Sequence, residues 1–149
     1  MKHTLLLDAN RCSGCMSCIV ACMDQNDTDV LKDNLSWRWV FQIEAGNGSN
    51  NIEYLSSSCR HCEDAPCIKG CPTGALSIDP QTEAVLVTTE SCIGCRSCVQ
   101  ACPFGVPRFG TDGKMQKCNL CFERISNNLE PACVRVCPTK ALKFGNMTV

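Results

Sequence analysis

The sequence lacks the features that mark several common functional classes. None of its apolar runs approaches the ~18 residues that a transmembrane helix requires, so no direct membrane span is expected. It contains no basic run, and 14 Lys and Arg are balanced by 15 Asp and Glu, so no nucleic-acid partner is expected. A Gly-rich phosphate loop, a serine elbow and a dinucleotide-binding fingerprint are all missing. These absences predict a protein without catalytic residues of its own.

Aromatic residues are scarce, whereas cysteine is abundant. Aromatic side chains make up 5% of the 149 residues, which is little for a side-chain core, and 16 residues are cysteine. Such a count indicates a disulfide framework, structural zinc or iron–sulfur clusters. The stretch MKHTLLLDANRC at the start has only three consecutive apolar residues and no twin-arginine pair, unlike an export signal. We therefore expect a cytoplasmic protein whose reduced thiols bind metal, with disulfides the least favoured interpretation. Export together with a partner that carries the signal is the alternative location.

The cysteines fall into four groups of four, with none left over. Every group opens with Cys-x-x-Cys and closes with Cys-x-x-x-Cys, and proline follows the last cysteine in groups two, three and four. The groups are Cys12, Cys15, Cys18 and Cys22; Cys59, Cys62, Cys67 and Cys71; Cys92, Cys95, Cys98 and Cys102; and Cys118, Cys121, Cys133 and Cys137.

Two internal repeats relate these groups in pairs. Residues 12–22, CSGCMSCIVAC, and residues 92–102, CIGCRSCVQAC, are identical at seven of eleven positions. Residues 66–78, PCIKGCPTGALSI, align with residues 132–144, ACVRVCPTKALKF, and share both cysteines, Pro-Thr and Ala-Leu. The chain thus contains two versions of one plan, with the seam near residues 79–84.

Short elements separated by loops are expected. A gap of three residues places two cysteines one helical turn apart, and the following proline ends that turn. We predict short helices over residues 18–23, 67–71, 98–102 and 133–137, and short strands over residues 3–8, 74–78, 84–89 and 141–145. Residues 37–55 are typical of a hairpin with the polar GNGSNN at its tip, in which Trp37, Trp39 and Phe41 pack in a satellite core or face a partner.

The cysteine spacing favours iron–sulfur clusters over zinc. Three thiolates at gaps of two can surround one [4Fe–4S] cluster, and in bacterial two-cluster ferredoxins the fourth cysteine of this run ligates the other cluster. A structural zinc site instead joins two Cys-x-x-Cys pairs on one ion. Group four, with its gap of eleven residues, is compatible with a small zinc ribbon when taken alone. Its closing Cys-Pro and its kinship to group two argue against zinc.

Residues 59–102 resemble a bacterial two-cluster ferredoxin. The similarity is carried by CPTGALSIDPQTEAVLVTTESCIGC, residues 71–95, which reads as Cys-Pro, strand, turn, strand and the next Cys-x-x-Cys. Groups one and four flank this unit at the two ends of the chain. The resemblance implies an α+β fold of two nested bacterial-type 2[4Fe–4S] ferredoxin units. The inner unit would be residues 59–102, and the outer unit residues 1–58 plus 103–149 with a hairpin insertion at about 37–55.

The nested plan, with SCRHCEDAPC at 58–67 and KMQKCNLCFER at 114–124, resembles a larger family. This family comprises the four-cluster electron-transfer subunits of molybdopterin and tungstopterin oxidoreductases, with the dimethyl sulfoxide reductase iron–sulfur subunit as archetype. The sequence is most similar to small soluble members, such as those of aldehyde oxidoreductases. The resemblance implies four [4Fe–4S] clusters, a large molybdopterin or tungstopterin catalytic partner, aldehyde oxidoreductase-like or otherwise, and a further electron donor or acceptor.

The ligand pattern of the family carries over to all 16 cysteines, because every motif position is a cysteine here. It implies four ligand sets: set A is Cys12, Cys15, Cys18 and Cys137; set B is Cys22, Cys118, Cys121 and Cys133; set C is Cys59, Cys62, Cys67 and Cys102; and set D is Cys71, Cys92, Cys95 and Cys98. The outer sets A and B are expected to face the catalytic subunit, and the inner sets C and D the acceptor.

The function that follows is an electron relay. We expect His61 to form hydrogen bonds or pack beside a cluster rather than transfer protons. Basic residues near the cysteines either offset cluster charge or lie in solvent, and they are Arg60, Lys69, Arg96, Lys117, Arg124, Arg135 and Lys140. The alternative function is an iron–sulfur or metal carrier, or maturation protein, for such an enzyme.

Overall fold

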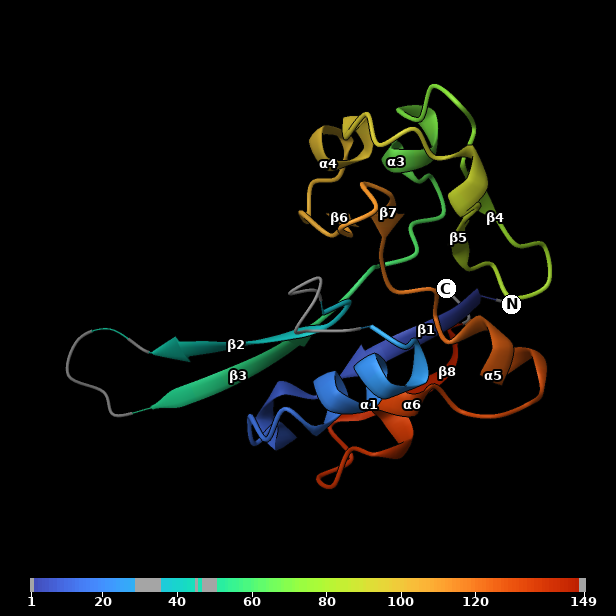
Figure 1. Ribbon diagram of the computed structural model, residues 1–149. Coiled ribbons are helices and arrows are strands. Elements are labelled where there is room, and N and C mark those ends of the chain that lie inside the picture. The colour runs from blue at the N-terminus through green and yellow to red at the C-terminus, as the bar shows by residue number, and fades with distance from the viewer. Residues whose placement is uncertain (1, 29–35, 45, 47–50, 148–149) are drawn as a thin grey trace.

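The protein folds into two lobes and a projecting hairpin (Figure 1). The computed structural model describes residues 2–28, 36–44, 46 and 51–147. Within these residues the strands form two-stranded antiparallel sheets, and the helices are nine residues or shorter. The tip of the predicted hairpin, at residues 45 and 47–50, lies outside the described residues. The short antiparallel strands and short helices expected from the sequence are confirmed.

The terminal lobe joins the two ends of the chain. Strands β1 and β8 pair antiparallel from Leu7 opposite Leu142 to Lys2 opposite Met147, and α1 packs beside α6 (Figure 1). The elements of this lobe are β1 (Lys2–Leu7), η1 (Ala9–Arg11), α1 (Ser17–Gln25), α5 (Phe122–Ser126), α6 (Ala132–Arg135) and β8 (Leu142–Met147).

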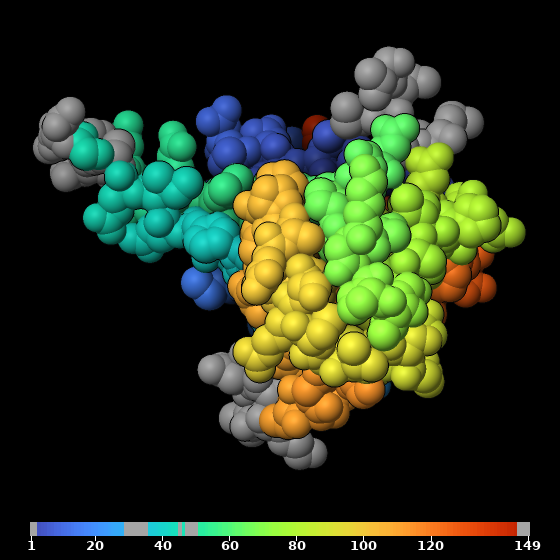
Figure 2. Space-filling model, turned by 90° about the horizontal axis from the view of Figure 1, so that it is seen from above, coloured from blue at the N-terminus to red at the C-terminus, as the bar shows by residue number. Residues whose placement is uncertain are grey.

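The central lobe repeats this arrangement with residues from the middle of the chain. Strands β4 and β5 pair antiparallel, and α3 packs beside α4. In Figure 2 the green segment that holds α3 lies beside the yellow-to-orange segment that holds α4. A small hairpin of β6 and β7 lies next to them (Figure 1). The elements are α3 (Pro66–Lys69), β4 (Leu76–Ile78), β5 (Val85–Val87), η2 (Thr89–Ser91), α4 (Ser97–Ala101), β6 (Arg108–Phe109) and β7 (Met115–Gln116).

The projecting hairpin is made of β2 (Trp39–Glu44) and β3 (Ile52–Ser57), in register from Trp39 opposite Ser57 to Glu44 opposite Ile52. Its base is attached to the central lobe. The Trp37 indole N–H donates to Gln116 Oε1 at 3.1 Å, and the Arg108 guanidinium lies 4.8 Å from the Trp39 ring centroid. Trp37 and Trp39 are therefore half-buried against the central lobe, whereas Phe41 is 48% exposed.

The buried cores of both lobes are small and rich in cysteine. In the terminal lobe three cysteines pack with Val134, Ala141 and Leu142, and in the central lobe two pack with residues such as Leu76, Val85 and Met115. Large aromatic side chains contribute little to either buried cluster. The hydrophobic effect therefore has limited apolar surface to act on, as expected from the low aromatic content.

The predicted elements are found within a few residues of their expected positions, and several short elements were not predicted. The helix expected at 18–23 runs over Ser17–Gln25, and the hairpin expected at 37–55 ends at Ser57. Helix α5 and the β6–β7 hairpin have no counterpart in the sequence predictions. No helix in the described part of the chain combines the length and apolar character needed to cross a bilayer.

Candidate iron–sulfur sites

All four Cys-x-x-Cys motifs make the same backbone turn. The residue before the second cysteine has a positive φ in each motif, with values of 69° at Gly14, 45° at His61, 70° at Gly94 and 61° at Leu120. Side chains other than glycine rarely adopt this conformation, so its recurrence indicates a common requirement. The turn reverses the backbone between two cysteines and so directs both sulfurs to one side.

Glycine occupies this position where space is tightest. A Cβ built on Gly14 would lie 2.5 Å from the Tyr54 ring, and one built on Gly94 would lie 2.6 Å from the Gly113 carbonyl oxygen. Both distances are shorter than real Cβ contacts. The two related groups, one and three, therefore need glycine for space as well as for φ.

Backbone and side-chain donors lie near several sulfurs. The N–H groups of His61 and Leu120 donate to Cys59 Sγ and Cys118 Sγ, each at 3.4 Å, and Met115 N–H donates to Cys92 Sγ at 3.5 Å. The lengths are normal for sulfur acceptors, and such bonds tune the reduction potential of a cluster.

Hydroxyl groups mark two equivalent cysteines of the second repeat. Thr73 Oγ1 lies 3.6 Å from Cys71 Sγ, and Thr139 Oγ1 lies 3.7 Å from Cys137 Sγ. For both cysteines burial raises the pKa of the thiol, but hydrogen bonds from the threonine and from backbone amides outweigh burial and lower it. These thiols are therefore predisposed to become thiolates, which is the form that binds metal.

Three cavities are each lined by four cysteines. The cysteines that line them are those of set A in one cavity, set C in the second and set D in the third. In every case three cysteines come from one group and the fourth from another. Group two, for example, contributes Cys59, Cys62 and Cys67 to one cavity and Cys71 to another.

The four cysteines of set B are all buried and lie close to one another. Burial raises the pKa of the Cys22 thiol above its usual range, and the neighbouring Cys118, Cys133 and Cys121 raise it further. Burial likewise raises the pKa of Cys133 to about 11, although Arg38 opposes the change. One guanidinium does not offset four thiolates held side by side in such a site, so the site fits a metal cluster, which supplies the further positive charge.

Two cysteines at equivalent places reach the surface. Cys15 and Cys95 are the exposed cysteines, and both follow the glycine of their Cys-x-x-Cys motif. Hydrogen bonding to Ser17 lowers the pKa of Cys15, and hydrogen bonding to Ser97 lowers that of Cys95. Set A and set D therefore each have one edge in contact with solvent.

The donor sets fit [4Fe–4S] clusters better than single ions. Four thiolates are the usual ligands of such a cluster, and they are held around a cube rather than at one point. Among the described residues no three His, Cys, Asp or Glu side chains are placed to hold one metal ion. Group two also sends its last cysteine to the cavity of group three, so it does not close on itself as a separate zinc site would.

Comparison with known proteins decides the family. A model described as a 4Fe-4S dicluster domain matches residues 50–147, about two thirds of the sequence, and one described as a 4Fe-4S binding domain matches residues 9–24. This protein belongs to the 4Fe-4S dicluster domain family. The match at residues 9–24 places a further iron–sulfur motif at group one.

Relatives of this dicluster protein are subunits of reductases and dehydrogenases. It is 38% identical over 154 residues to the B subunit of anaerobic dimethyl sulfoxide reductase of Escherichia coli (strain K12), with 97% of this sequence and 73% of the relative covered. It is 40% identical over 148 residues to the thiosulfate reductase electron transfer subunit PhsB of Salmonella typhi, covering 98% and 77%. The nitrate-inducible formate dehydrogenase iron-sulfur subunit of E. coli is 37% identical, and 53% of it is covered.

His61 behaves in the dicluster protein as expected from the sequence. It is 3% exposed, and its Nδ1 accepts a hydrogen bond from Val85 N–H at 3.0 Å, in addition to the backbone bond to Cys59. The ring thus joins group two to strand β5. The predicted structural role in hydrogen bonding is confirmed.

The basic residues divide into buried and solvent-facing ones. Of the seven noted in the sequence, Lys117 is buried at 4% exposure, whereas Lys69 pairs at the surface with Asp64 at 2.6 Å. Arg135 and Lys140 are exposed. Arg60 and Arg96 stack on Phe104 and Phe109 at 5.7 and 5.3 Å. The remaining one, Arg124, donates from Nε to the Glu130 carbonyl at 2.7 Å and from Nη1 to Gln25 Oε1 at 3.3 Å.

The sequence did not point to Arg38 as a functional residue. Its side chain is 2% exposed and is the largest of the fully buried side chains among the described residues. It lies between Trp37 and Trp39 in the sequence. A lone charge between two aromatic residues is the one signal that could have pointed to its burial.

Proposed function

We propose that this chain is the iron–sulfur subunit of a molybdopterin oxidoreductase complex and relays single electrons through four [4Fe–4S] clusters. The observation that carries the proposal is the lining of three cavities by four cysteines each, drawn from different groups. The relatives named as electron-transfer or iron–sulfur subunits support the same role. The chain is therefore an electron-transfer subunit and not the catalytic one.

We propose sets A, B, C and D as the ligands of the four clusters. The lining of the three cavities supports sets A, C and D, and the mutual proximity of four buried thiols supports set B. In this assignment Cys22 and Cys137 exchange between the first and last groups, and Cys71 and Cys102 exchange between the middle groups. Each exchange fixes two neighbouring sites in one rigid frame.

The nested arrangement is part of the proposal, with residues 59–102 as the inner ferredoxin-like unit and residues 1–58 plus 103–149 as the outer one. The pairing of β1 with β8 beside α1 and α6, and of β4 with β5 beside α3 and α4, supports two units of one plan. The β6–β7 hairpin follows Cys102 in the sequence but packs on the inner unit, through Met115 and Phe109.

The relay runs between two surface edges. When bound, [4Fe–4S] clusters supply reversible one-electron chemistry. Cys15 and Cys95 bring sets A and D to the surface, where a partner can approach. Set B is buried, and set C lies next to it because Lys117, beside Cys118, lines the set C cavity. The cysteines of set B are buried and those of set C are half-buried, and this placement supports the order A, B, C, D for the relay.

We propose a catalytic subunit of the molybdopterin type as the partner, and the relatives named as subunits of dimethyl sulfoxide reductase and thiosulfate reductase support a partner of the reductase class. We also propose that the outer sets A and B face this subunit, which can be of the tungstopterin or aldehyde oxidoreductase-like type. A further electron donor or acceptor and a location in the cytoplasm are part of the same proposal. Anaerobic purification with the native partner, followed by identification of the large subunit, tests these points together. Fractionation of the cells tests the location.

Metal analysis and redox titration test the central claim. We expect about 16 iron and about 16 acid-labile sulfide per protein molecule, and four reversible one-electron signals by EPR. About eight iron with stoichiometric zinc would contradict the assignment and favour zinc in groups two and four. Loss of the clusters to an apo-acceptor protein, without reversible reduction, would instead support the carrier function.

A further inference from the structure

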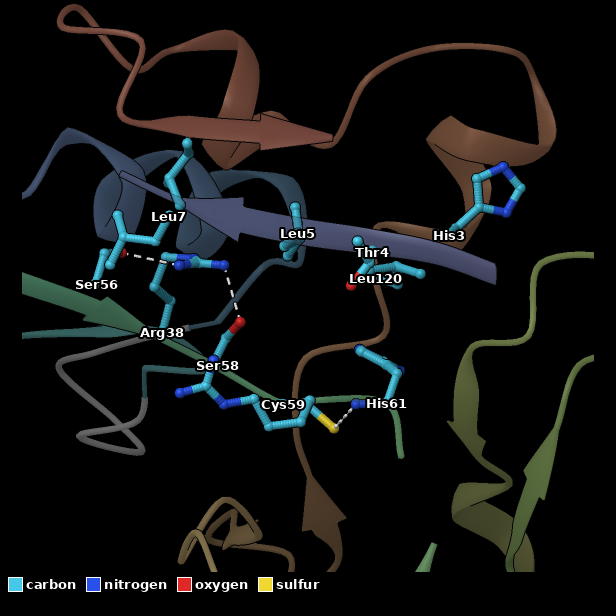
Figure 3. Close-up of a pocket in the computed structure, with 12 residues that line it drawn as sticks. His3, Thr4, Leu5, Leu7, Arg38, Ser56, Ser58, Cys59, His61 and Leu120 are labelled. Atoms are coloured by element: carbon cyan, nitrogen blue, oxygen red, sulfur yellow. Dashed lines mark hydrogen bonds between the residues drawn. The ribbon is translucent and has the colours of Figure 1, made fainter. Parts of the chain in front are cut away.

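Arg38 is held rigidly in the interior of the terminal lobe. Its guanidinium donates to Ser56 Oγ and to Ser58 Oγ, each at 2.8 Å, as Figure 3 shows. Ser56 Oγ in turn lies 3.4 Å from Cys18 Sγ. The arginine also lines a cavity of about 100 Å³ that Cys59 and His61 border on the other side. A fork of two hydrogen bonds thus fixes the cation in one place.

No carboxylate of the described residues forms an ion pair with Arg38. A buried cation without a counter-charge costs several kcal/mol, so negative groups must lie nearby. Burial lowers the pKa of Arg38, but the neighbouring Cys133, Cys118, Cys18 and Cys22 raise it. Three of these four cysteines belong to set B, and Cys18 belongs to set A.

Lys117 holds a similar place farther along the path. Its ammonium donates to the carbonyl oxygens of Val85 and Cys118, the latter at 3.0 Å. The lysine lines the cavity of set C, and it opposes the rise that burial causes in the pKa of Cys59 and of Cys67. Lys117 is therefore the buried cation of set C, whereas the cavity of set D is lined by the exposed Arg96.

The two cations favour the reduced form of the clusters beside them. Reduction adds one electron, and therefore one negative charge, to a cluster. A fixed positive charge in a medium of low dielectric stabilises the more negative state, and net charge is one of the determinants of cluster potential. The solvent-facing Arg135 and Lys140 act weakly by comparison, because water and salt screen them.

We propose that Arg38 and Lys117 set the order of potentials along the relay, Arg38 raising the potentials of the set B and set A clusters and Lys117 that of the set C cluster. The inference rests on the proposed electron-transfer function and on ligand sets A to D. It implies that the two middle sites of the path, B and C, are easier to reduce than they would be without these cations. The set D cluster receives no such assistance from a buried cation of the described residues.

Redox titration of single variants by EPR tests the proposal. In Arg38→Gln we expect the equilibrium constant for reduction of the set B cluster to fall at least tenfold, which lowers its potential by about 59 mV for one electron. The potential of the set A cluster should fall less, and that of the set D cluster should not change. In Lys117→Gln we expect a similar fall for set C, and none for sets A and D. The two variants thus differ in what they predict for set A, which falls in Arg38→Gln and stays unchanged in Lys117→Gln.

Two further variants separate charge from structure. Arg38→Lys keeps the charge but loses the two-pronged donation to Ser56 and Ser58, so most of the set B potential should be retained. Arg135→Gln removes an exposed charge two residues from both Cys133 and Cys137, and we expect it to leave all four potentials unchanged. If Arg38→Lys shifts set B as much as Arg38→Gln does, the role is structural and the proposal is wrong.

Metal content distinguishes this failure from failure of the proposed function. Variants that retain about 16 iron per molecule but show no shift in potential overturn the role of the cations and leave the relay intact. A wild-type protein with fewer clusters overturns the relay itself. If Arg38→Gln does not assemble its clusters, two variants still test the proposal. Lys117→Gln tests whether loss of a buried cation lowers the set C potential, and Arg38→Lys tests whether the set B potential is retained when the charge is kept.

Discussion

The terminal and central lobes contain related cysteine motifs in different surroundings. In groups one and four, which build the terminal lobe, six of eight cysteines are buried, whereas in groups two and three only Cys92 and Cys98 are. The turns, the short helices and the paired strands are shared by both lobes. One local plan can therefore present a metal site at different depths, and depth is a determinant of cluster potential and lability.

The source of the difference lies outside the motifs. The terminal lobe is covered by the base of the β2–β3 hairpin, which brings Arg38 and Ser56 over the sites, and by α5. At the central lobe the cysteine sites are met by the small β6–β7 hairpin, whose Met115 N–H bonds to Cys92. Insertions between the repeated motifs thus give each half its own environment.

Removal of iron should have the largest effect and should separate the lobes. Because cysteines form much of both cores, we expect a chelator under reducing, anaerobic conditions to abolish cooperative unfolding. The set C and D clusters should be lost first and set B last. A local opening of the protein whose free energy is ~1.4 kcal/mol higher occurs about tenfold less often, so the rates of cluster loss from the two lobes should differ on the order of tenfold. EPR and iron analysis over time measure this, and loss of all four clusters at one rate would remove the distinction between the lobes.

Substitution of the cysteine that one group contributes to the site of another should have the next largest effect. In Cys102→Ser we expect the spectrum and potential of the set C cluster to change while set D stays nearly intact, because Cys102 lines the cavity of Cys59, Cys62 and Cys67. Cys22→Ser is the matched variant in the terminal lobe and should affect set B but not set A. EPR after anaerobic purification is the measurement.

The opposite result has a clear signature. If Cys102→Ser converts only the cluster of Cys92, Cys95 and Cys98 to a three-iron form, each group is self-contained. The exchange of ligands, and with it the nested arrangement, would then be wrong.

The equivalent glycines of the two related groups should differ in their tolerance of a methyl group. Gly94→Ala places a Cβ against a backbone carbonyl, which cannot move easily, so we expect a loss of about 2–4 kcal/mol in stability. Gly14→Ala meets the Tyr54 ring, a side chain that can rotate, and should cost about 1–2 kcal/mol. Gly74→Ala, also at positive φ but in open space, is the control.

Thermal unfolding of the cluster-loaded proteins, followed by loss of cluster absorbance, ranks the three glycine variants. An equal shift for Gly94→Ala and Gly74→Ala would show that φ alone matters at these turns.

The threonine hydroxyls should give the smallest effect. Thr139→Val and Thr73→Val each remove a hydroxyl next to the last cysteine of a group, and should lower the potentials of sets A and D respectively. We expect the equilibrium constant for reduction to change by less than tenfold, so each potential should shift by less than about 59 mV. The shift should be larger for Thr139→Val, because Thr139 is less exposed than Thr73. Redox titration measures both, and a rise in either potential would contradict the assigned role of the hydroxyls.

The sequence predicted the elements that depend on local pattern. Cysteine spacing, the Cys-Pro ends and short apolar runs were sufficient for α1, α3, α4 and α6 and for β1, β4, β5 and β8. The hairpin of β6 and β7 was missed because its strands have only two residues each, although Asp112 and Gly113 at its turn are a hairpin signal. Helix α5, with five residues in the eleven-residue gap of group four, is too short for a helical period to appear.

Burial was harder to predict than position. The surroundings of Arg38 are made by Ser56, by Cys18 and Cys22, and by Cys118 and Cys133, which are far apart in the sequence. No local pattern reports such a neighbourhood. For the same reason the sequence could not separate Lys117 from the solvent-facing Lys140, although both lie near a cysteine.

The pairing of β1 with β8 has a consequence for synthesis on the ribosome. Strand β1 is made first, but its partner, Leu142–Met147, emerges some 135 residues later. Under the proposed ligand sets, A waits for Cys137 and B for Cys133, whereas C and D are complete once Cys102 has emerged. At translation rates of ~5–20 residues per second, the ligands of the central sites are complete about 2–7 seconds before those of the terminal ones. The central sites are thus the first that can accept clusters, and pairing of the first strand with the last completes the fold.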